Sequence, residues 1–232
     1  MLTRVFVNIT RYVRLIDKPV GFSSYQMVRV FTSCYDKVGH AGTLDPCASG
    51  LLIILIGKAT KRSQTLQQCE KEYVGELLLG MTTDTYDMSG NVERIWSQHA
   101  RQRTCSPPPF SIGMLNSVAQ TFVGTIEQEP PRYSALKHKG RKLYELSRKG
   151  IRVRPQRRKV FIRSFSVIAY THPVVSFTTV VGKGVYIRSL AHDIGTELGT
   201  GATLLSLRRT KIGDYSVDDA ETLGSVLNEM ST

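Results

Sequence analysis

The sequence predicts a mixed α and β fold, because some segments carry strand-like apolar runs and others carry helical spacing. The clearest strand is the run of residues 51–56 (LLIILI), which ends at Gly57. The clearest helix follows Ser23, whose spacing to Gln26 is that of a capping box. Apolar residues at offsets of three and four come next, so we expect a helix to begin near Ser24.

The middle of the chain continues this alternation. Residues 73–79 form a short apolar run that is typical of a strand, and residues 82–91 read as a turn region. Residues 97–111 are polar and contain three consecutive prolines, which indicates an exposed connection. A short helix is expected over residues 142–149, because its leucines can face inward and its basic residues outward.

The last third of the chain predicts a pair of strands and a helix. Residues 160–170 and 174–181 are rich in β-branched and aromatic side chains, as in paired strands. Residues 187–198 have helical apolar spacing, and Gly199 is a suitable end for that helix. We find no internal repeat or low-complexity tract.

Length and composition indicate one large globular domain. A chain of 232 residues with 41% hydrophobic residues can bury a sizeable core. The longest apolar run falls far short of the roughly 20 residues that a membrane-spanning helix needs. The N-terminus lacks the apolar stretch of an export signal, so we expect a cytoplasmic protein. Cys34, Cys47, Cys69 and Cys105 are too widely spaced for a CxxC pair, which predicts thiols and no structural zinc.

The charge is strongly positive and unevenly placed. The net charge of +12 indicates a polyanionic partner, most often a nucleic acid. Nearly all of it lies in residues 137–163, here called the basic segment, where Glu145 is the one acidic residue. A run of charges is usually only a solvated face, but this concentration favours phosphate binding.

Residues 39–46 (GHAGTLDP) place a carboxylate on a glycine-flanked loop beside an imidazole. The glycines allow unusual backbone geometry, and Pro46 disfavours helical geometry at Asp45. The strand that follows would anchor the loop to a rigid core, as active sites require. Asp-Pro in such a stretch is also a common turn, and His40 could be a core histidine, so the loop alone decides nothing.

Cofactor motifs are incomplete. The sequence around Gly57 and Lys58 has Leu52 and Ala59 where a phosphate-binding loop needs glycine and Ser or Thr. A calcium-binding loop near Asp84 fails as well. No nucleotide, metal or hydride-carrying cofactor is indicated.

Several short segments, spread over nearly the whole chain, form an ordered series. They are residues 17–24 (DKPVGFSS), 39–46 (GHAGTLDP), 71–73 (KEY), 79–84 (LGMTTD), 130–137 (PPRYSALK), 140–146 (GRKLYEL), 182–190 (GKGVYIRSL) and 207–210 (LRRT). In this order and spacing the chain resembles the TruB-type tRNA pseudouridine synthases of the bacterial, stand-alone kind. The resemblance implies an α+β pseudouridine synthase fold, with a mixed, mainly antiparallel central sheet flanked by helices and loops.

The resemblance also implies a reaction, the isomerisation of uridine to pseudouridine at position 55 in the T-loop of tRNA. The uracil leaves its glycosidic bond, turns within the site and rejoins the ribose through C5, so no cofactor is required. The target nucleotide must be flipped out, because its glycosidic bond is inaccessible in a folded stem-loop. Attack on the ribose and attack on the base both stay open.

The family pattern assigns roles to particular residues. Asp45 matches the nucleophile, and Arg188 matches the basic partner that keeps the carboxylate ionised and oriented. Tyr73 matches the aromatic residue that stacks on the target base, and His40 matches the residue associated with nucleotide flipping. The remaining matches are the pocket positions Tyr186 and Leu207 and the supporting positions Lys18 and Pro19.

The basic segment matches most of the family's thumb, an insertion over about residues 131–163 that closes on the RNA loop. The side chains expected to bind RNA are Lys137, Lys139, Arg141, Lys142, Arg148, Arg152 and Arg154. The resemblance divides the chain into a catalytic domain, residues 1–212, and a short C-terminal segment, residues 213–232, without a full PUA domain. We expect a monomer that acts on tRNA without membrane, guide RNA or obligate protein partner.

Three other functions are open to a chain with this charge or chemistry. A non-catalytic RNA-binding module or tRNA-folding chaperone explains the charge but not the combination of Asp45, Tyr73, Tyr186 and Arg188. A glycosidase would generally use two carboxylates, and the sequence offers one compelling candidate. A catalytic subunit of a guide-RNA complex would keep the chemistry but is expected to carry further segments.

Overall fold

The computed structural model describes residues 12–95, 109–134, 136–138, 140–151 and 153–230. The chain divides into two compact units. The first unit contains the residues up to Val74 and those from Leu207 onward, and the second runs from Gly75 to Ser206. Strands β4 (Lys71–Leu79) and β12 (Ala202–Ile212) each contribute residues to both units.

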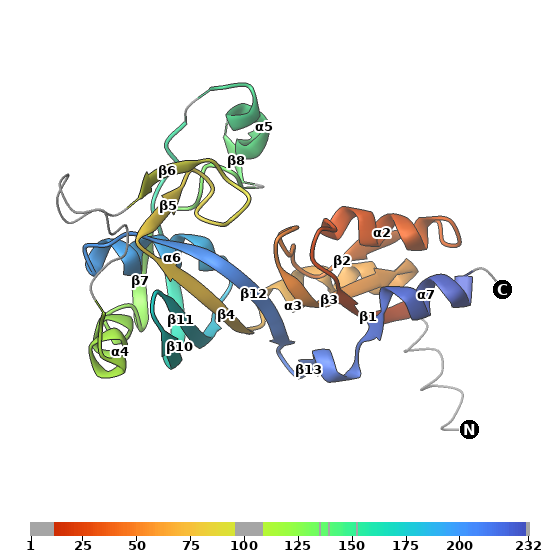
Figure 1. The fold of residues 1–232 in the computed structure, drawn as a ribbon. Coiled ribbons are helices and arrows are strands. Elements are labelled where there is room, and N and C mark those ends of the chain that lie inside the picture. The colour runs from red at the N-terminus through yellow and green to blue at the C-terminus, as the bar shows by residue number, and fades with distance from the viewer. Residues whose placement is uncertain (1–11, 96–108, 135, 139, 152, 231–232) are drawn as a thin grey trace. The chain divides into compact units, whose positions relative to one another are not determined.

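The first unit is built on the strand order β14-β1-β3-β12, of which β1, β3 and β12 are labelled in Figure 1. Its strands are β1 (Val13–Lys18), β2 (Val38–His40), β3 (Ser49–Ile56), the second half of β12, β13 (Tyr215–Ser216) and β14 (Glu221–Thr222). Strand β3 pairs antiparallel with β1 and β2 and parallel with β12. The strand predicted over residues 51–56 is therefore confirmed, and it lies inside the sheet with partners on both edges.

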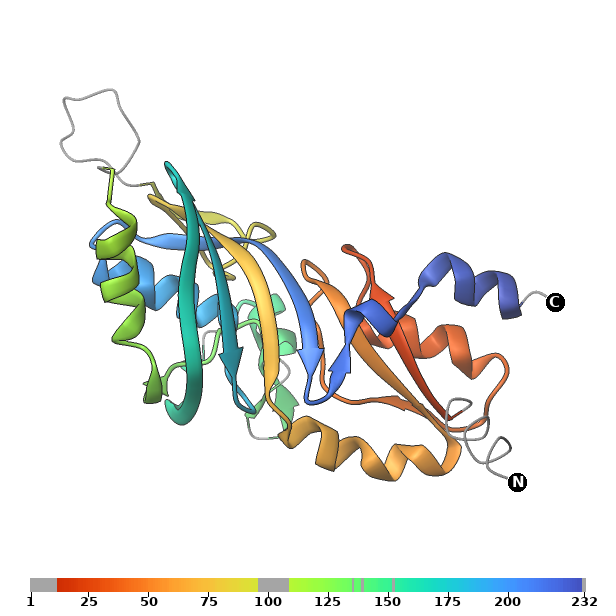
Figure 2. The same ribbon diagram turned by 90° about the horizontal axis from the view of Figure 1, so that it is seen from below.

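Strand β3 is apolar on both faces because helices or loops cover each of them. Its even-numbered residues pack with β1 and with helices α2 (Ser24–Thr32) and α7 (Leu223–Met230). Its odd-numbered residues pack with α3 (Ser63–Gln68) and the short helix η2 (Val217–Asp219). Helix α3 follows directly on the 3₁₀ helix η1 (Gly57–Arg62), and the pair can be traced in Figure 2. Two core clusters thus hold β3 and the loop before it in place.

Helix α2 begins at the residue that the sequence predicts. Ser23 accepts a hydrogen bond from the Gln26 backbone, and the Gln26 side chain accepts one from the Ser23 backbone, which completes the capping box. The buried face carries Met27, Val28 and Phe31. The capping box sets the start of the helix, and the apolar face fixes its rotation against β3.

The second unit has the strand order β12-β4-β11-β10-β7. Besides β4 and the first half of β12, its strands are β7 (Gly124–Gln128), β10 (Arg158–Thr171) and β11 (Val174–Val181). Strands β10 and β11 form the predicted antiparallel pair, and β7 extends it along the other edge of β10. The stacked rings of Phe165 and Phe177, 4.9 Å apart, lie in the core of this pair.

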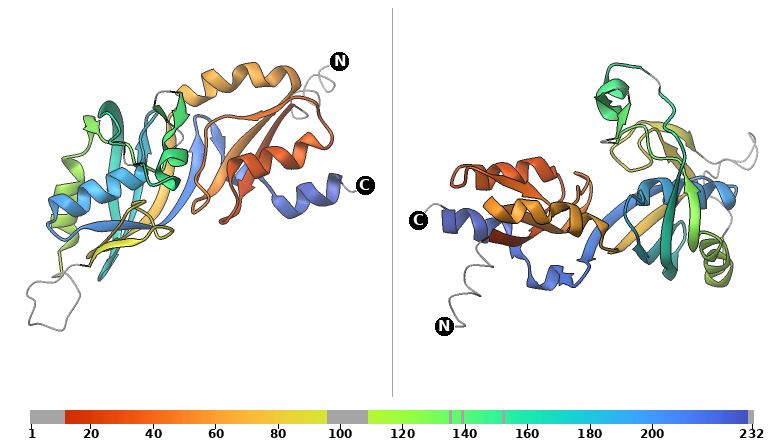
Figure 3. Two further views of the ribbon diagram at one scale, coloured as in Figure 1. Left: turned by 90° about the horizontal axis from the view of Figure 1, so that it is seen from above. Right: turned by 180° about the vertical axis from the view of Figure 1, so that it is seen from behind.

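Two helices, α4 (Ile112–Gln120) and α6 (Ile187–Glu197), belong to this sheet. Helix α6 confirms the helix predicted over residues 187–198. Helix α4 lies against β10 (Figure 3), where Gln120 donates a hydrogen bond to the Phe165 carbonyl. The sequence does not predict α4, because the polar, proline-containing stretch before it is typical of a connection up to Ser111. Ser111 is in fact the N-cap of this helix.

Smaller elements complete the second unit. They are the ribbon of β5 (Met81–Thr83) with β6 (Val92–Ile95), the ribbon of β8 (Lys137–His138) with β9 (Arg141–Lys142), and helix α5 (Leu143–Arg148). The turn region expected at residues 82–91 therefore begins inside β5, and most of it forms the turn between β5 and β6. Helix α5 confirms the short helix predicted over residues 142–149.

The fold is the predicted α+β arrangement with a mixed, mainly antiparallel sheet. Of the expected connection at residues 97–111, residues 97–108 lie outside the described residues, as does Cys105. Cys34, Cys47 and Cys69 form no disulfide bond within the described ranges. None of the helices in the described part of the chain has the length and apolarity needed to span a lipid bilayer.

Candidate active site

The loop of residues 39–46 leaves the sheet at the end of β2 and carries Asp45 back towards β3. Residue His40 pairs with Ile54, and the Ala41 backbone N–H donates to the Ile53 carbonyl at 3.0 Å. Gly42 then takes a φ of +101°, a conformation that other residues rarely adopt. The backbone therefore turns away from the strand at a glycine, as the sequence indicates.

A buried serine holds the residue before Asp45. The Ser24 hydroxyl donates to the Leu44 carbonyl at 2.9 Å and accepts from the Leu44 N–H at 2.8 Å. After Asp45, the Ala48 N–H donates to the Asp45 carbonyl at 3.1 Å and closes a turn. Asp45 itself is partly exposed. The loop is thus fixed on both sides of a carboxylate that solvent can reach.

Lys18 lies beneath this loop. Its side chain has 0% exposure, and Nζ donates to the carbonyls of Pro19 and Phe22, both at 2.7 Å. The Gly21 N–H donates to the Pro46 carbonyl at 2.8 Å, which joins the segment after Lys18 to the loop. Burial lowers the pKa of Lys18 to about 8, although the negative charge of Asp45 acts to raise it. Lys18 is therefore mostly charged at neutral pH.

Arg209 is a second buried cation at the loop, and sequence reasoning missed it as a site residue. Its guanidinium donates to the carbonyls of Gly42, Thr43 and Leu51. The motif at residues 207–210 is the signal in the sequence, but the family pattern assigns a role to Leu207 alone within it.

His40 is a largely buried histidine at the start of the loop. Burial lowers the pKa of its imidazole, and the positive charge of Arg209 lowers it further. Its Nδ1 is buried and makes no hydrogen bond to the described residues. The ring is therefore neutral at pH 7, which fits a positional role better than acid–base work. Tyr73 on β4 and Leu207 on β12 are nearly buried side chains of the same unit.

In the second unit, Arg188 on α6 is organised by backbone and carboxylate oxygens. The guanidinium is 5% exposed and donates to the carbonyls of Thr85 and Tyr133, at 3.0 and 3.1 Å. Its Nε lies 3.5 Å from a carboxylate oxygen of Asp87. Arg188 is thus fixed by the β5–β6 turn and by the segment that follows β7.

Asp87 is a buried carboxylate that sequence reasoning did not select, because residues 82–91 were read as a turn. Burial acts to raise its pKa, but hydrogen bonds from Ser89 and Thr85 and the charge of Arg188 together lower it. It is therefore ionised at neutral pH and supplies the counter-charge for Arg188. The available signal was its polar environment of Thr85 and Ser89 within the turn.

Tyr186 is the N-cap residue of α6 and is held by a fully buried glutamine. Gln128 accepts from the Tyr186 N–H at 2.8 Å and donates to the Tyr186 carbonyl at 3.1 Å. The guanidinium of Arg158 stacks over the Tyr186 ring, 5.0 Å from its centre. The ring is therefore fixed both through its backbone and through its face.

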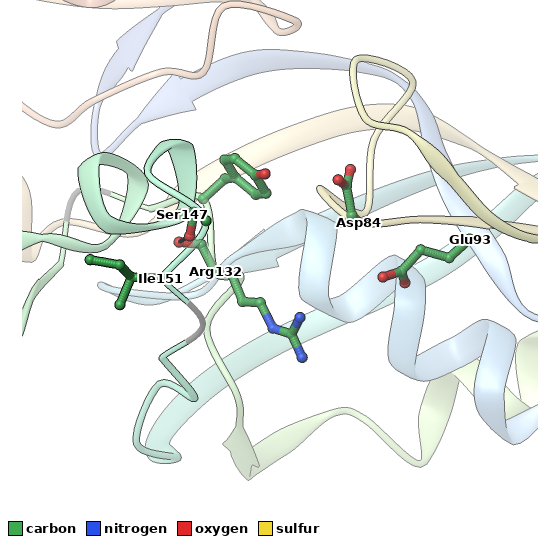
Figure 4. A pocket seen from close by; sticks show the side chains of 7 residues that line it. Asp84, Glu93, Arg132, Ser147 and Ile151 are labelled. Atoms are coloured by element: carbon green, nitrogen blue, oxygen red, sulfur yellow. Dashed lines mark hydrogen bonds between the residues drawn. The ribbon is translucent and has the colours of Figure 1, made fainter.

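The segment after β7 contributes a pocket of about 210 Å³ to the second unit (Figure 4). It is lined by Asp84, Glu93, Arg132, Tyr133, Ser147, Gly150 and Ile151. Figure 4 shows Arg132, Ser147 and Ile151 on one side of it and Asp84 and Glu93 on the other. The pocket is polar and carries both signs of charge.

Parts of the basic segment can be placed. Arg141 and Arg154 are exposed, and the Arg154 guanidinium donates to the Glu129 carboxylate at 3.0 Å. Arg157 lies 3.7 Å from the same carboxylate. Of the other side chains expected to bind RNA, Lys139 and Arg152 lie outside the described residues, and Lys137, Lys142 and Arg148 are described by their backbone alone.

Comparison with known families covers nearly all of this chain. Residues 29–187 match the N-terminal domain of the TruB family pseudouridylate synthases. Residues 188–232 match the C-terminal domain of tRNA pseudouridylate synthase B. The border between the two matches falls at the start of α6. The division predicted from the sequence, residues 1–212 and 213–232, stays a prediction.

Similar proteins agree with the family match. The tRNA pseudouridine synthase B of Clostridium kluyveri is 42% identical over 207 residues, which cover 88% of this chain and 68% of the relative. The protein of that name from Chloroherpeton thalassium is 39% identical over 223 residues, which cover 93% of this chain and 89% of the relative. These matches define the class of the protein as a pseudouridylate synthase, an isomerase. Within that class, the chain belongs to the TruB family.

Solved structures support the fold. A chain of the Cbf5–Nop10–Gar1 complex matches with a TM-score of 0.70 at 28% identity, over 97% of this chain and 56% of that chain. A chain of the archaeal box H/ACA sRNP Nop10–Cbf5 complex matches with a TM-score of 0.67 at 26% identity. This chain spans a little over half the length of these solved chains.

Proposed function

We propose that the protein isomerises uridine to pseudouridine in the T-loop of tRNA, at position 55, with Asp45 as the nucleophile. The observation that carries this proposal is the fixed loop around Asp45 in a chain of the TruB family. Relatives about 40% identical over most of the chain bear the name tRNA pseudouridine synthase B, which supports tRNA as the substrate.

The reaction balances without a cofactor. The bond between C1′ and N1 of the uridine breaks, the uracil turns, and a bond forms between C1′ and C5. The proton on C5 is lost and N1 gains a proton, so the product is an isomer of the substrate. Asp45 forms a covalent intermediate that divides this rearrangement into two easier steps.

Other side chains of the site position the target. We propose that Arg188 pairs with Asp45 in the working site, Tyr73 stacks on the base, and His40 takes part in flipping the nucleotide. Tyr186 and Leu207 line the base pocket, and Lys18 and Pro19 support the loop. The internal contacts of Lys18 and Tyr186 support these last two roles, because each residue is held by two partly buried hydrogen bonds.

RNA affinity is assigned to the thumb, residues 131–163. Lys137, Lys139, Arg141, Lys142, Arg148, Arg152 and Arg154 would neutralise phosphates of the T stem-loop. We also propose that the protein acts as a monomer in the cytoplasm, without guide RNA or protein partner. Activity of the purified protein on naked tRNA tests this part of the proposal.

The experiment is to map pseudouridine in total tRNA by carbodiimide labelling after incubation with purified protein. We expect product at position 55 with the wild type and a loss of at least about 1000-fold in rate with Asp45→Asn. The matched control is Asp36→Asn, the same chemical change at an exposed aspartate of the same unit.

The alternatives give different results. Product formed by Asp45→Asn at the wild-type rate contradicts the assigned nucleophile. Release of free uracil would identify a glycosidase, and tRNA binding without any product would leave an RNA-binding module.

A further inference from the structure

We propose that Arg209 is a positioning residue for the loop that carries Asp45. The inference rests on the proposed function, because it concerns how the loop presents the nucleophile. Its guanidinium contacts backbone carbonyls of the loop and of β3, so the role assigned to it is exerted through the backbone of the loop.

The contacts of Arg209 join three backbone segments of the first unit. Nε donates to the Leu51 carbonyl on β3 at 2.8 Å. Nη1 donates to the Thr43 carbonyl at 3.3 Å, and Nη2 donates to the Gly42 carbonyl at 3.2 Å. One rigid group thus ties the turn that precedes Asp45 to β3.

This geometry requires a guanidinium. Its donors point in fixed directions from one plane, whereas a lysine ammonium is a compact point charge on a flexible stem. Arg209 is 1% exposed, and no carboxylate pairs with it within the described part of the chain. An unpaired cation is expensive to bury, so a core position without another task would favour an apolar side chain.

The close pairing of β12 with β3 places Arg209 next to the loop. Strand β12 runs parallel to β3 with Arg209 opposite Gly50. A side chain on Gly50 would meet the Arg209 backbone, since an added Cβ would lie 2.3 Å from the Arg209 carbonyl oxygen. The glycine thus permits the close approach that places the guanidinium within reach of Gly42 and Thr43.

The charge of Arg209 supplies an independent readout. It lowers the pKa of the His40 imidazole and acts in the same direction on Lys18. A variant without this charge should therefore raise the His40 pKa, which NMR of the imidazole measures directly. A variant that keeps the charge but lacks the planar set of guanidinium donors should leave the His40 pKa low.

The experiment compares Arg209→Lys and Arg209→Gln with a matched control, Arg208→Gln. Arg208 lies next on the same strand but is only partly buried, and it pairs with Asp17 instead of the loop. The single-turnover rate constant for pseudouridine formation and the Kd for tRNA are measured separately. Thermal unfolding first identifies the variants that fold.

We expect both Arg209 variants to lose about 100-fold in the rate constant, since small misplacements of a reacting group have effects of this size. The Kd for tRNA should change by less than about threefold. Only Arg209→Gln should raise the His40 pKa, and Arg208→Gln should resemble the wild type in both measurements. A wild-type rate in Arg209→Lys, or a rate loss that follows the loss of tRNA affinity, would overturn the proposal.

Failure of the proposed function is distinguishable from failure of this inference. If the wild type makes no pseudouridine, amide hydrogen exchange at Ala41 and Leu44 still tests the positioning role, because both N–H groups are hydrogen-bonded in the loop. Exchange there should accelerate in Arg209→Gln but not in Arg208→Gln. Equal exchange in the two, or an inability of both Arg209 variants to fold, would place Arg209 in the general core and contradict the inference.

Discussion

Lys18 shows how a single buried charge makes the loop sensitive to pH. Burial disfavours the ammonium form, whereas the charge of Asp45 and the carbonyls of Pro19 and Phe22 favour it. Burial is the larger effect, because the pKa falls from 10.5 to about 8. At neutral pH the group keeps its charge, so a positive potential persists beneath Asp45.

The lowered pKa predicts a pH dependence of stability. Between about pH 8 and pH 10.5 the unfolded chain binds a proton at Lys18 that the folded chain has lost. Stability therefore rises with pH across this window and is flat below it. Relative to Lys18→Met, the wild type should gain roughly 2–3 kcal/mol over that range in urea unfolding. The control Lys58→Met alters an exposed ammonium group and should keep the wild-type dependence. A constant difference between wild type and Lys18→Met would contradict the prediction.

Among the elements, the parallel pairing of β3 with β12 depends on one glycine. Gly50 has a φ of +102°, and its missing side chain leaves room for the Arg209 backbone. A side chain at position 50 would therefore lower the stability in two ways, through backbone strain and through a collision between the strands. The two effects can be measured separately by comparison with a glycine that has the same φ but enough space around it for a side chain.

Gly124 provides that comparison. Its φ is +101°, and an added Cβ would meet nothing within 4 Å. We expect Gly124→Ala to lose about 1–2 kcal/mol from strain alone, and Gly50→Ala to lose at least about 2 kcal/mol more. Equilibrium urea unfolding of both variants measures the difference. Equal losses would mean that the two strands can separate to admit a methyl group.

The elements that the sequence predicted are those with local signals. The capping box marks the start of α2, the run of residues 51–56 marks β3, and β-branched residues mark β10 and β11. The second half of β12 gave no such signal, because the polar series at residues 207–210 hides a strand whose Arg209 faces the interior.

The residues of the candidate site also differ in whether a local sequence pattern identifies them. Asp45, His40 and Lys18 stand in motifs that resemble a family, so they could be selected from the sequence. Arg209 and Asp87 each lie in a segment with a local signal, but the groups that they hold in place lie far away in the chain, so a local pattern does not reveal their partners. Charge and motif select the residues that are expected to act on the substrate, whereas the contacts that hold those residues in place require coordinates.

On the scale of the whole molecule, the net charge of +12 is concentrated where the proposed thumb lies. Arg154 and Arg157 already share the Glu129 carboxylate. Exposed ion pairs of this kind are weak, so an RNA phosphate can replace the carboxylate at little cost. The rest of the surface has charges of both signs, and it should contribute little to the salt dependence of RNA binding.

This distribution predicts which arginines set the salt dependence of tRNA binding. Binding releases counterions, so log Kd changes linearly with log salt concentration, and each lost phosphate contact should lower the slope by roughly 0.7–0.9. The double variant Arg141→Gln/Arg154→Gln should therefore lower it by roughly 1.5. Its matched control, Arg29→Gln/Arg62→Gln, removes the same charge from exposed positions of the first unit and should leave the slope nearly unchanged. Filter binding from low to moderate salt measures both. If the two double variants change the slope equally, the protein attracts tRNA through its overall charge, and the thumb has no special part in phosphate binding.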